Sequence, residues 1–205
     1  MTAQSPTPAG RNGARGRPRD ATIDDAVLEA TRDLLVDEGY GAVTMNAVAR
    51  RAGTTKTALY RRWASKTELV HEAVLPSGVD EMAELDDDPR TAVEQMLRWT
   101  RDRFSEPAMR AALPGIVTDL RRDPALATRI LARFAPTFAV LDAHLASARR
   151  RGSIAADADP MTVAQMVGGP VVVALLIDPD IRLDEAWIRT TAHLLTSGFA
   201  DVHSH

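Results

Sequence analysis

The sequence predicts an all-α protein made of an N-terminal three-helix unit with a helix-turn-helix and a C-terminal helical bundle. Apolar residues make up 45% of the 205 residues and aromatic residues only 4%, which suits helices better than sheets. The apolar residues recur at helical spacing, and Pro, Gly and capping residues separate the segments. We expect about nine helices in total and no strands.

Residues 1–19 form the first segment, which we expect to be a disordered arm. The segment is rich in Pro, Gly, Ser and Arg, and it offers almost nothing that a core could bury. Its last arginines, Arg17 and Arg19, directly precede the first expected helix.

The first helix is expected to start at Thr22, whose hydroxyl can accept from a free amide, with Asp25 three residues later as in a capping box. Gly39 ends this helix. Between these ends a stripe of apolar residues can be buried. The stripe consists of Ile23, Ala26, Val27, Ala30, Leu34 and Leu35.

Residues 44–63 are the most informative stretch, because they predict two short helices joined at one glycine. Thr44 can cap the first of them, and Gly53 stands where the chain must turn, since glycine adopts a left-handed backbone at little cost. In the second helix Leu59 and Trp63 point inward, four residues apart. The opposite face carries small polar and cationic groups of the kind that read a DNA major groove. These exposed residues are Thr55, Lys56, Thr57, Tyr60 and Arg61.

A full capping box, Ser65 to Glu68, opens the next helix, which ends at Pro76. We therefore expect one domain over residues 20–76, which carries the DNA-reading face, and a second domain over residues 77–205, whose residues suited to ligand binding and dimerisation are described below. The acidic segment 78–88 is expected to be the joint between them.

Acid-proline pairs mark the helices of the second domain, because a carboxylate favours a helix N-terminus and proline needs no amide in the first turn. These pairs are Asp88-Pro89, Glu106-Pro107, Asp123-Pro124 and Asp159-Pro160. We expect helices at about 89–105, 107–121, 124–151, 160–177 and 184–200, with a kink at Pro170.

Composition excludes several classes of protein. The chain has no cysteine, which rules out disulfides and zinc–thiolate sites. We find no apolar run of the roughly 18 residues that a membrane span needs and no signal peptide, so we expect a cytoplasmic protein. No motif of a hydrolase, nucleotide-binding loop or histidine metal site occurs. We therefore expect no enzyme activity, no cofactor, no metal and no membrane partner.

Charge is divided unevenly along the chain. Residues 1–66 hold 11 Lys and Arg against 7 Asp and Glu, whereas the remainder holds 14 against 21. A basic first third can meet phosphates that the acidic remainder would repel, although chance segregation of charges on solvated faces would give the same difference.

Together, the first helix, the 44–63 unit and the capping box at Ser65 resemble the TetR family of bacterial transcriptional regulators. Ala52-Gly53, Leu59-Tyr60, Trp63 and Ser65-Lys66 carry this resemblance. Arg61-Arg62-Trp63 is similar to a subgroup with Trp where many members carry Phe, and Thr54 stands where Val is common. The resemblance covers about residues 20–76; beyond them only length, helicity and two apolar final helices agree.

The resemblance implies a homodimeric repressor that binds double-stranded operator DNA and releases it when a small-molecule effector enters the C-terminal domain. An arginine arm before the helix-turn-helix could also follow the minor groove, and a solubilising tail is an equally good explanation of it. The expected DNA-contacting residues are Thr44, Thr54, Thr55, Lys56, Thr57, Tyr60, Arg61, Lys66, Arg17 and Arg19.

Aromatic and sulfur-containing residues of the second domain can line an apolar ligand pocket between helices, although ordinary core packing is the simpler reading of each one alone. The expected ligand-binding residues are Trp99, Arg103, Phe104, Met109, Leu113, Phe134, Phe138 and Met166.

The last two helices are too apolar for a monomer, and small residues allow two copies to approach closely. The expected dimer interface consists of Gly169, Val173, Leu176, Trp187, Thr191, Leu195 and Phe199. Two rival functions stay open: a ligand-independent DNA-binding regulator or activator, and a small-molecule-binding protein or enzyme with a vestigial helix-turn-helix.

Overall fold

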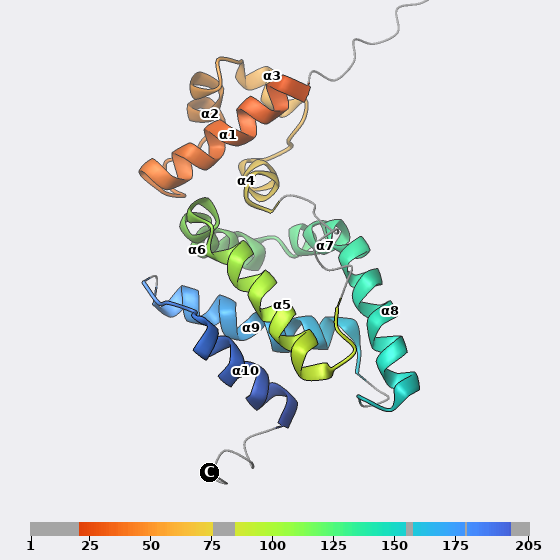
Figure 1. The fold of residues 1–205 in the computed structure, drawn as a ribbon. Coiled ribbons are helices and arrows are strands. Elements are labelled where there is room, and N and C mark those ends of the chain that lie inside the picture. Colours follow the sequence, from red (N-terminus) through yellow and green to blue (C-terminus); the bar gives the residue numbers. More distant parts are fainter. Residues whose placement is uncertain (1–20, 76–84, 155–157, 179, 198–205) are drawn as a thin grey trace, which may run out of the picture.

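The computed structural model describes residues 21–75, 85–154, 158–178 and 180–197, and every regular element in these ranges is a helix (Figure 1). The four N-terminal helices form one unit and the other helices form a bundle beside it. The N-terminal helices are α1 (Ala21–Glu38), α2 (Met45–Arg51), α3 (Lys56–Tyr60) and α4 (Lys66–Val74). The others are α5 (Pro89–Ser105), α6 (Pro107–Arg122), α7 (Pro124–Arg133), α8 (Ala135–Arg151), α9 (Pro160–Ile177) and α10 (Glu185–Ser197).

The described residues thus hold ten helices, where the sequence predicted about nine. The helix expected over 124–151 is two helices, because the chain leaves helical geometry at Phe134 (φ −90°, ψ 3°) and starts again with Pro136 in the first turn of α8. A proline there has no amide to donate and clashes with the carbonyl four residues earlier. By contrast, α9 continues through Pro170 as one helix.

Most of the expected helix caps are present. Ser65 accepts from the Glu68 amide at 3.1 Å, and Asp88, Asp123 and Asp159 each accept from an amide of the helix that follows. One expectation was wrong, because α1 begins at Ala21 and Thr22 therefore lies within the helix. Glu106 stands at the N-cap of α6 as expected, with Pro107 in the first turn, and makes no side-chain capping bond.

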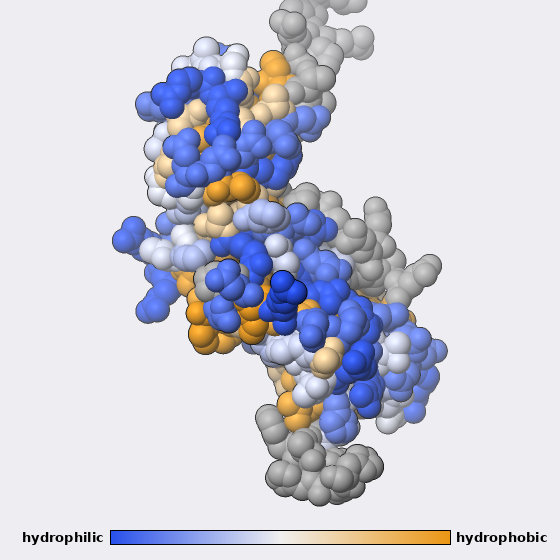
Figure 2. Space-filling model, turned by 60° about the vertical axis from the view of Figure 1, so that its left-hand side comes forward, coloured by the Kyte–Doolittle hydropathy of each residue, from blue (hydrophilic) through white to orange (hydrophobic). Residues whose placement is uncertain are grey.

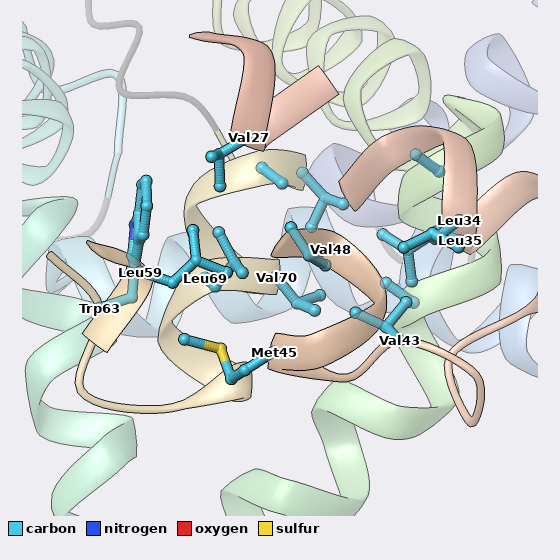
Figure 3. Close-up of a cluster of buried hydrophobic side chains, with 14 of the residues drawn as sticks. Val27, Leu34, Leu35, Val43, Met45, Val48, Leu59, Trp63, Leu69 and Val70 are labelled. Atoms are coloured by element: carbon cyan, nitrogen blue, oxygen red, sulfur yellow. The ribbon is translucent and has the colours of Figure 1, made fainter. Parts of the chain in front are cut away.

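The core of the N-terminal unit extends into the bundle (Figure 3). Val27, Leu35, Leu59 and Leu69 are completely buried in it, from three different helices. Helix α6 completes this core although it lies beyond the expected boundary at residue 76. The contributing residues of α6 are Ala108, Met109, Ala112 and Ile116.

The core of the bundle is built around α5, which packs against both α9 and α10. Its buried members include Leu97, Leu141, Val171 and Ile188. Glu185 of α10 accepts from Arg98 and Arg101 of α5, each at 2.9 Å, and so fixes these two helices together. Helix α8 packs against α7 and α9.

Helix α9 corrects one sequence expectation, because its 18 residues are long and apolar enough to cross a membrane by length and composition. In the fold it buries Val167, Val171 and Leu175 in the bundle core. The opposite face is exposed, with Val173 at 53% and Ile177 at 78%. Figure 2 shows apolar side chains gathered on the surface of the bundle on this side. The apolar character of α9 is therefore divided between a core face and an uncovered face.

Candidate nucleic-acid interface and ligand pockets

The helix-turn-helix has the geometry that the sequence predicts. Gly53 turns the chain at φ +65°, in the left-handed region. Leu59 and Trp63 are buried at 0% and 3% exposure and anchor α3 to the core. Because these anchors fix the inner face of α3, its outer face is left to solvent.

The outer face of this unit presents a compact set of polar side chains. Tyr60 is 49% exposed, and the Lys56 ammonium lies 5.7 Å from the centroid of its ring. Thr54 is half-buried. The exposed members of the expected set are Thr44, Thr55, Lys56, Thr57, Tyr60 and Arg61.

Two threonines of this set serve as helix caps. Thr44 Oγ1 accepts from the Ala47 amide at 3.1 Å, and Thr55 Oγ1 accepts from the Ala58 amide at 3.2 Å. A hydroxyl that accepts still has its own hydrogen to donate, so both can hold their helix and offer a donor to a phosphate.

Lys66, another expected DNA contact, interacts with Tyr40 within the protein. Its ammonium donates to the Tyr40 carbonyl at 2.6 Å and lies 3.9 Å from the centroid of the Tyr40 ring. Burial lowers the pKa of Lys66, and the nearby Asp119 carboxylate partly opposes this shift. The bond to Tyr40 uses one of the three N–H donors of the ammonium, so the expected contact of Lys66 with the DNA backbone stays a prediction. Arg17 and Arg19 lie outside the described residues.

A polar cluster joins the N-terminal unit to α6. The Tyr40 hydroxyl and Thr67 Oγ1 both donate to Asp119 Oδ2, the latter over 2.7 Å. Gly115, one turn before Asp119, lies flat against the Tyr40 ring, because a Cβ there would stand 2.2 Å from a ring carbon. We call Tyr40, Lys66, Thr67, Gly115 and Asp119 the interdomain cluster.

Charge and burial act together in the interdomain cluster. Burial raises the pKa of Asp119, but the hydrogen bonds from Tyr40 and Thr67 and the Lys66 ammonium outweigh it, and the net pKa is lowered. Burial and the bond to Asp119 raise the pKa of the Tyr40 hydroxyl, which stays protonated and donates. Asp119 is thus an ionised acceptor that holds groups from two segments of the N-terminal unit.

An open pocket of about 470 Å³ lies between α5, α8 and α9, and we call it the aromatic pocket. It brings together five of the eight residues that we expected to bind a ligand. Trp99 is one of them, and its buried Nε1–H has no acceptor among the described residues. The five expected residues are Trp99, Arg103, Phe104, Phe134 and Phe138.

Three expected ligand-binding residues do not line the aromatic pocket. Met109 is 1% exposed and belongs to the core of the N-terminal unit, and Leu113 is buried in the core of the bundle. Both point away from the pocket because α6 turns its two faces to the two cores. Met166 is 52% exposed and lines a second pocket of about 510 Å³. This distal pocket lies between α5, α8, α9 and α10.

Sequence reasoning missed the residues that link the pocket to the N-terminal unit. Leu75, which ends α4, lines the aromatic pocket, and the interdomain cluster holds α6. Gly115 could have indicated this contact in the sequence, because a glycine inside a helix often marks close packing against a neighbouring element. The acidic segment 78–88, which we expected to be the joint, lies mostly outside the described residues.

The residues expected at a dimer interface are only partly exposed. Val173 and Leu176 are exposed on α9, and Gly169 is open, since a Cβ added there would meet no atom within 4 Å. Trp187 and Leu195 pack against the core of the bundle, and Leu195 also lines the distal pocket. Both are half-buried in the single chain, so their place in a dimer interface stays a prediction. Thr191 is half-buried, and Phe199 lies outside the described residues.

A helix-turn-helix unit carried on a helical bundle with an apolar pocket defines a DNA-binding regulator. Residues 27–73 match the family model described as bacterial regulatory proteins of the tetR family, and residues 83–195 match the tetracyclin repressor-like C-terminal domain. The chain therefore belongs to the TetR family of transcriptional regulators.

Relatives agree with this assignment over most of the chain. The HTH-type transcriptional regulator YdeS of Bacillus subtilis is 25% identical over 85% of this chain and 88% of its own length. The DNA-binding transcriptional repressor TetR of Mycobacteroides abscessus is 29% identical over 85% of this chain and 90% of its own.

Among solved structures, the regulator FadR of Bacillus subtilis in complex with stearoyl-CoA has the same fold, with a TM-score of 0.66 and 16% identity over 85% of this chain and 98% of that one. The TetR family regulator SCO0332 is 29% identical, with a TM-score of 0.61 over 86% of this chain and 97% of that one.

Proposed function

We propose that this regulator is a homodimeric repressor that leaves its operator DNA when a small apolar or amphipathic molecule enters the aromatic pocket. The observation that carries the proposal is the position of Leu75, which lines the pocket and ends α4. A molecule in the pocket therefore contacts the helix that directly follows the helix-turn-helix.

The mechanism is a shift between two populations of the dimer. Helix α4 packs against α1 and α6, and the interdomain cluster ties α6 to Tyr40 and Thr67. If a ligand moves α4 or α6, the helix-turn-helix unit moves with them. DNA then favours one spacing of the two reading helices and the ligand favours another.

Binding to DNA uses the exposed face of α3 in this proposal. Lys56, Thr57 and Arg61 face base edges or nearby phosphates, while Thr44 and Tyr60 donate to phosphates. The exposure of these side chains supports this assignment, as does the anchoring of the inner face by Leu59 and Trp63.

Homodimerisation uses the exposed face of α9 together with α10. Met166, Val173 and Ile177 recur at intervals of seven and four residues on this face, each more than half exposed. Contiguous apolar surface of this kind marks an interaction site in soluble proteins. The open Gly169 on the same face permits a close approach of a second helix.

A binding experiment with the full chain tests the proposal. Operator sequences are selected from a random DNA pool, and a small-molecule library is then screened by protein fluorescence and by release of operator DNA. Gly168 has only Thr100 Cγ2 within 4 Å of an added Cβ, at 3.9 Å, so Gly168→Met adds a side chain that fills the aromatic pocket.

We expect Gly168→Met to weaken effector binding at least about tenfold, equal to about 1.4 kcal/mol, and to leave DNA affinity without effector unchanged. Ala139→Met, at an exposed site on the neighbouring α8, is the matched control and should change neither. The proposal fails if every tight ligand leaves operator affinity unchanged.

Activation is a second candidate, because the transcriptional activator FasR of Mycolicibacterium smegmatis is 35% identical over 57% of this chain and 48% of its own length. Transcription in vitro from a promoter carrying the selected operator separates the two. Repression predicts less transcript when the protein is added and recovery with effector, whereas activation predicts more transcript on addition of the protein.

A further inference from the structure

The aromatic and distal pockets lie end to end along the same pair of helices. The aromatic pocket is lined by the C-terminal half of α5 and the N-terminal half of α8. The distal pocket is lined by the N-terminal half of α5 and the C-terminal half of α8. The two pockets thus follow each other along α5 and α8, which run in opposite directions, and α9 packs against both helices (Figure 1).

A single layer of side chains separates the two pockets. Met96 of α5, Leu141 of α8 and Val167 of α9 line both pockets, and they are 7%, 2% and 4% exposed. Each comes from a different helix, and all three are aliphatic. A methionine side chain has three rotatable bonds and adapts readily to its surroundings, so Met96 can turn aside without any backbone change.

The combined length of the two pockets fits an extended alkyl chain. From Pro89 to Phe104 of α5 the lining residues cover about 22 Å at about 1.5 Å per residue, and Met96 stands near the middle. An extended hydrocarbon advances about 1.3 Å per carbon, given a carbon–carbon bond of about 1.5 Å. One pocket thus takes about eight carbons and both together take about sixteen.

The polar groups of the two pockets determine which way round a bound alkyl chain lies. At the aromatic end Trp99 Nε1–H is buried without an acceptor among the described residues, and the Arg103 guanidinium lies 6.0 Å from the centroid of the Trp99 ring. Past the dividing layer Ala92, Val93 and Ala148 supply small apolar walls, and the lining also includes Asp87, His144, Ser153 and Thr196. The Asp87 carboxylate repels an anionic head group, whereas the Arg103 guanidinium attracts one, so the head group is placed at the first end and the alkyl tail against the small apolar walls of the second.

We propose that the effector of this regulator is an unbranched single-chain amphiphile that lies along both pockets, with its head group beside Trp99 and its tail past Met96 in the distal pocket. This inference rests on the proposed function and names the chemical class of its effector.

The test uses two homologous series of probes, sodium alkanoates and 1-alkanols of 6 to 16 carbons, each below its micellar concentration. Binding is measured by calorimetry, and release of operator DNA by fluorescence anisotropy. In the native protein each added methylene should tighten binding about fourfold, well beyond the about eight carbons that one pocket holds. The two series show whether the head group must carry a charge.

A matched pair of variants locates the tail. Ala148→Met narrows the distal pocket, and Ala164→Met makes the same change in the aromatic pocket. We expect Ala148→Met to leave six- and eight-carbon probes unaffected and to weaken sixteen-carbon probes at least a hundredfold. Ala164→Met should weaken probes of every length. Ala92→Met, at the opposite wall of the distal pocket, repeats the test should Ala148→Met lower the thermal midpoint.

The outcomes separate this inference from the proposed function. If short probes bind and release DNA but affinity stops rising near eight carbons in the native protein, the inference is wrong and the proposed function stands. Equal losses at all lengths in Ala148→Met also overturn it. If no probe of either series binds, the inference is again wrong, and the effector screen alone decides the proposed function.

Discussion

Gly115 illustrates at the scale of one residue how the two units are held together. Its missing side chain lets α6 approach the Tyr40 ring so closely that a Cβ would stand 2.2 Å from a ring carbon. The same ring carries the hydroxyl that donates to Asp119. Packing and hydrogen bonding at Tyr40 therefore depend on each other.

Gly115→Ala should move the Tyr40 ring and break its hydrogen bond with Asp119. Overpacking of this kind lowers the free energy of unfolding by about 1–3 kcal/mol. The better helix propensity of alanine offsets about 1 kcal/mol of this loss. We expect a lower thermal midpoint and a smaller effect of effector on DNA affinity. Gly41→Ala is the control, because no atom lies within 4 Å of its added Cβ. Equal effects of both changes would contradict the packing argument.

Asp119 predicts a pH dependence of stability. Its folded-state pKa is lowered overall, so its contribution is complete above the ordinary value of about 3.9 and is lost as pH falls through the folded pKa. Asp119→Asn should therefore lower the free energy of unfolding at pH 7. In acid, where Asp119 is protonated, the native protein and the variant should be equally stable. Urea unfolding between pH 2 and 7 measures the difference, with the exposed Asp25→Asn as control. A difference that persists at pH 2 would show that packing rather than charge is responsible.

Lys56 and Tyr60 are the residues on which the reading face of α3 is most directly tested. Lys56→Ala and Tyr60→Phe should each weaken DNA binding by about 1–2 kcal/mol if these groups meet phosphate or base. The control is Arg150→Ala, at an exposed site near the far end of α8. It also removes one positive charge and should change DNA affinity little. Anisotropy titrations that give equal losses for all three would argue against this face.

At the scale of the element, the helices with strong local signals were predictable. Thr44, Ser65 and the Asp-Pro pairs mark helix starts because a cap is a contact between near neighbours in sequence. The helix over 160–177 was predicted to run through Pro170, whereas the break at Phe134 was missed although Pro136 is a local signal for it. The role of α6 in the N-terminal core was not predictable, because either face of α6 could pack on either core.

The exposed face of α9 predicts how the dimer can be broken. Val173 is 53% exposed in the chain, so Val173→Glu should leave the monomer folded but bury an unpaired charge in the proposed interface, which costs several kcal/mol. Light scattering should report a monomer with an unchanged helical spectrum. Leu195→Glu is a poorer test, because Leu195 is half-buried against the bundle core and its replacement would also destabilise the monomer. A native protein that is already monomeric in solution would refute this interface.

At the scale of the whole molecule, charge and architecture point the same way. Most of the positive excess of residues 1–66 comes from residues 1–20, which hold four Arg against one Asp, while residues 21–66 hold seven Lys and Arg against six Asp and Glu. The negative remainder belongs mainly to the bundle. Composition could reveal this asymmetry because it needs no contacts. The positions of the pockets and of the interdomain cluster could not be inferred in advance, because they depend on residues more than fifty positions apart, such as Tyr40 and Asp119.

The same asymmetry yields a prediction for the N-terminal arm, which lies outside the described residues. Deleting residues 1–18 removes Arg11, Arg15 and Arg17. If these arginines follow the minor groove, each lost phosphate contact lowers the slope of log affinity against log salt by about 0.9, so the slope should fall by up to about three. The thermal midpoint should not change, because residues 1–18 offer almost no apolar side chain that a core could bury.

DNA titrations of the intact and shortened chains at several salt concentrations measure this slope, and a scrambled DNA sequence shows whether the arm adds specificity or only affinity. Arm contacts that are purely electrostatic should weaken operator and scrambled DNA by the same factor, since phosphates carry no sequence information. A larger loss on the operator would mean that the arginines also read the width of the minor groove. An unchanged slope on both would leave the arm as a solubilising tail and confine the DNA interface to the helix-turn-helix unit.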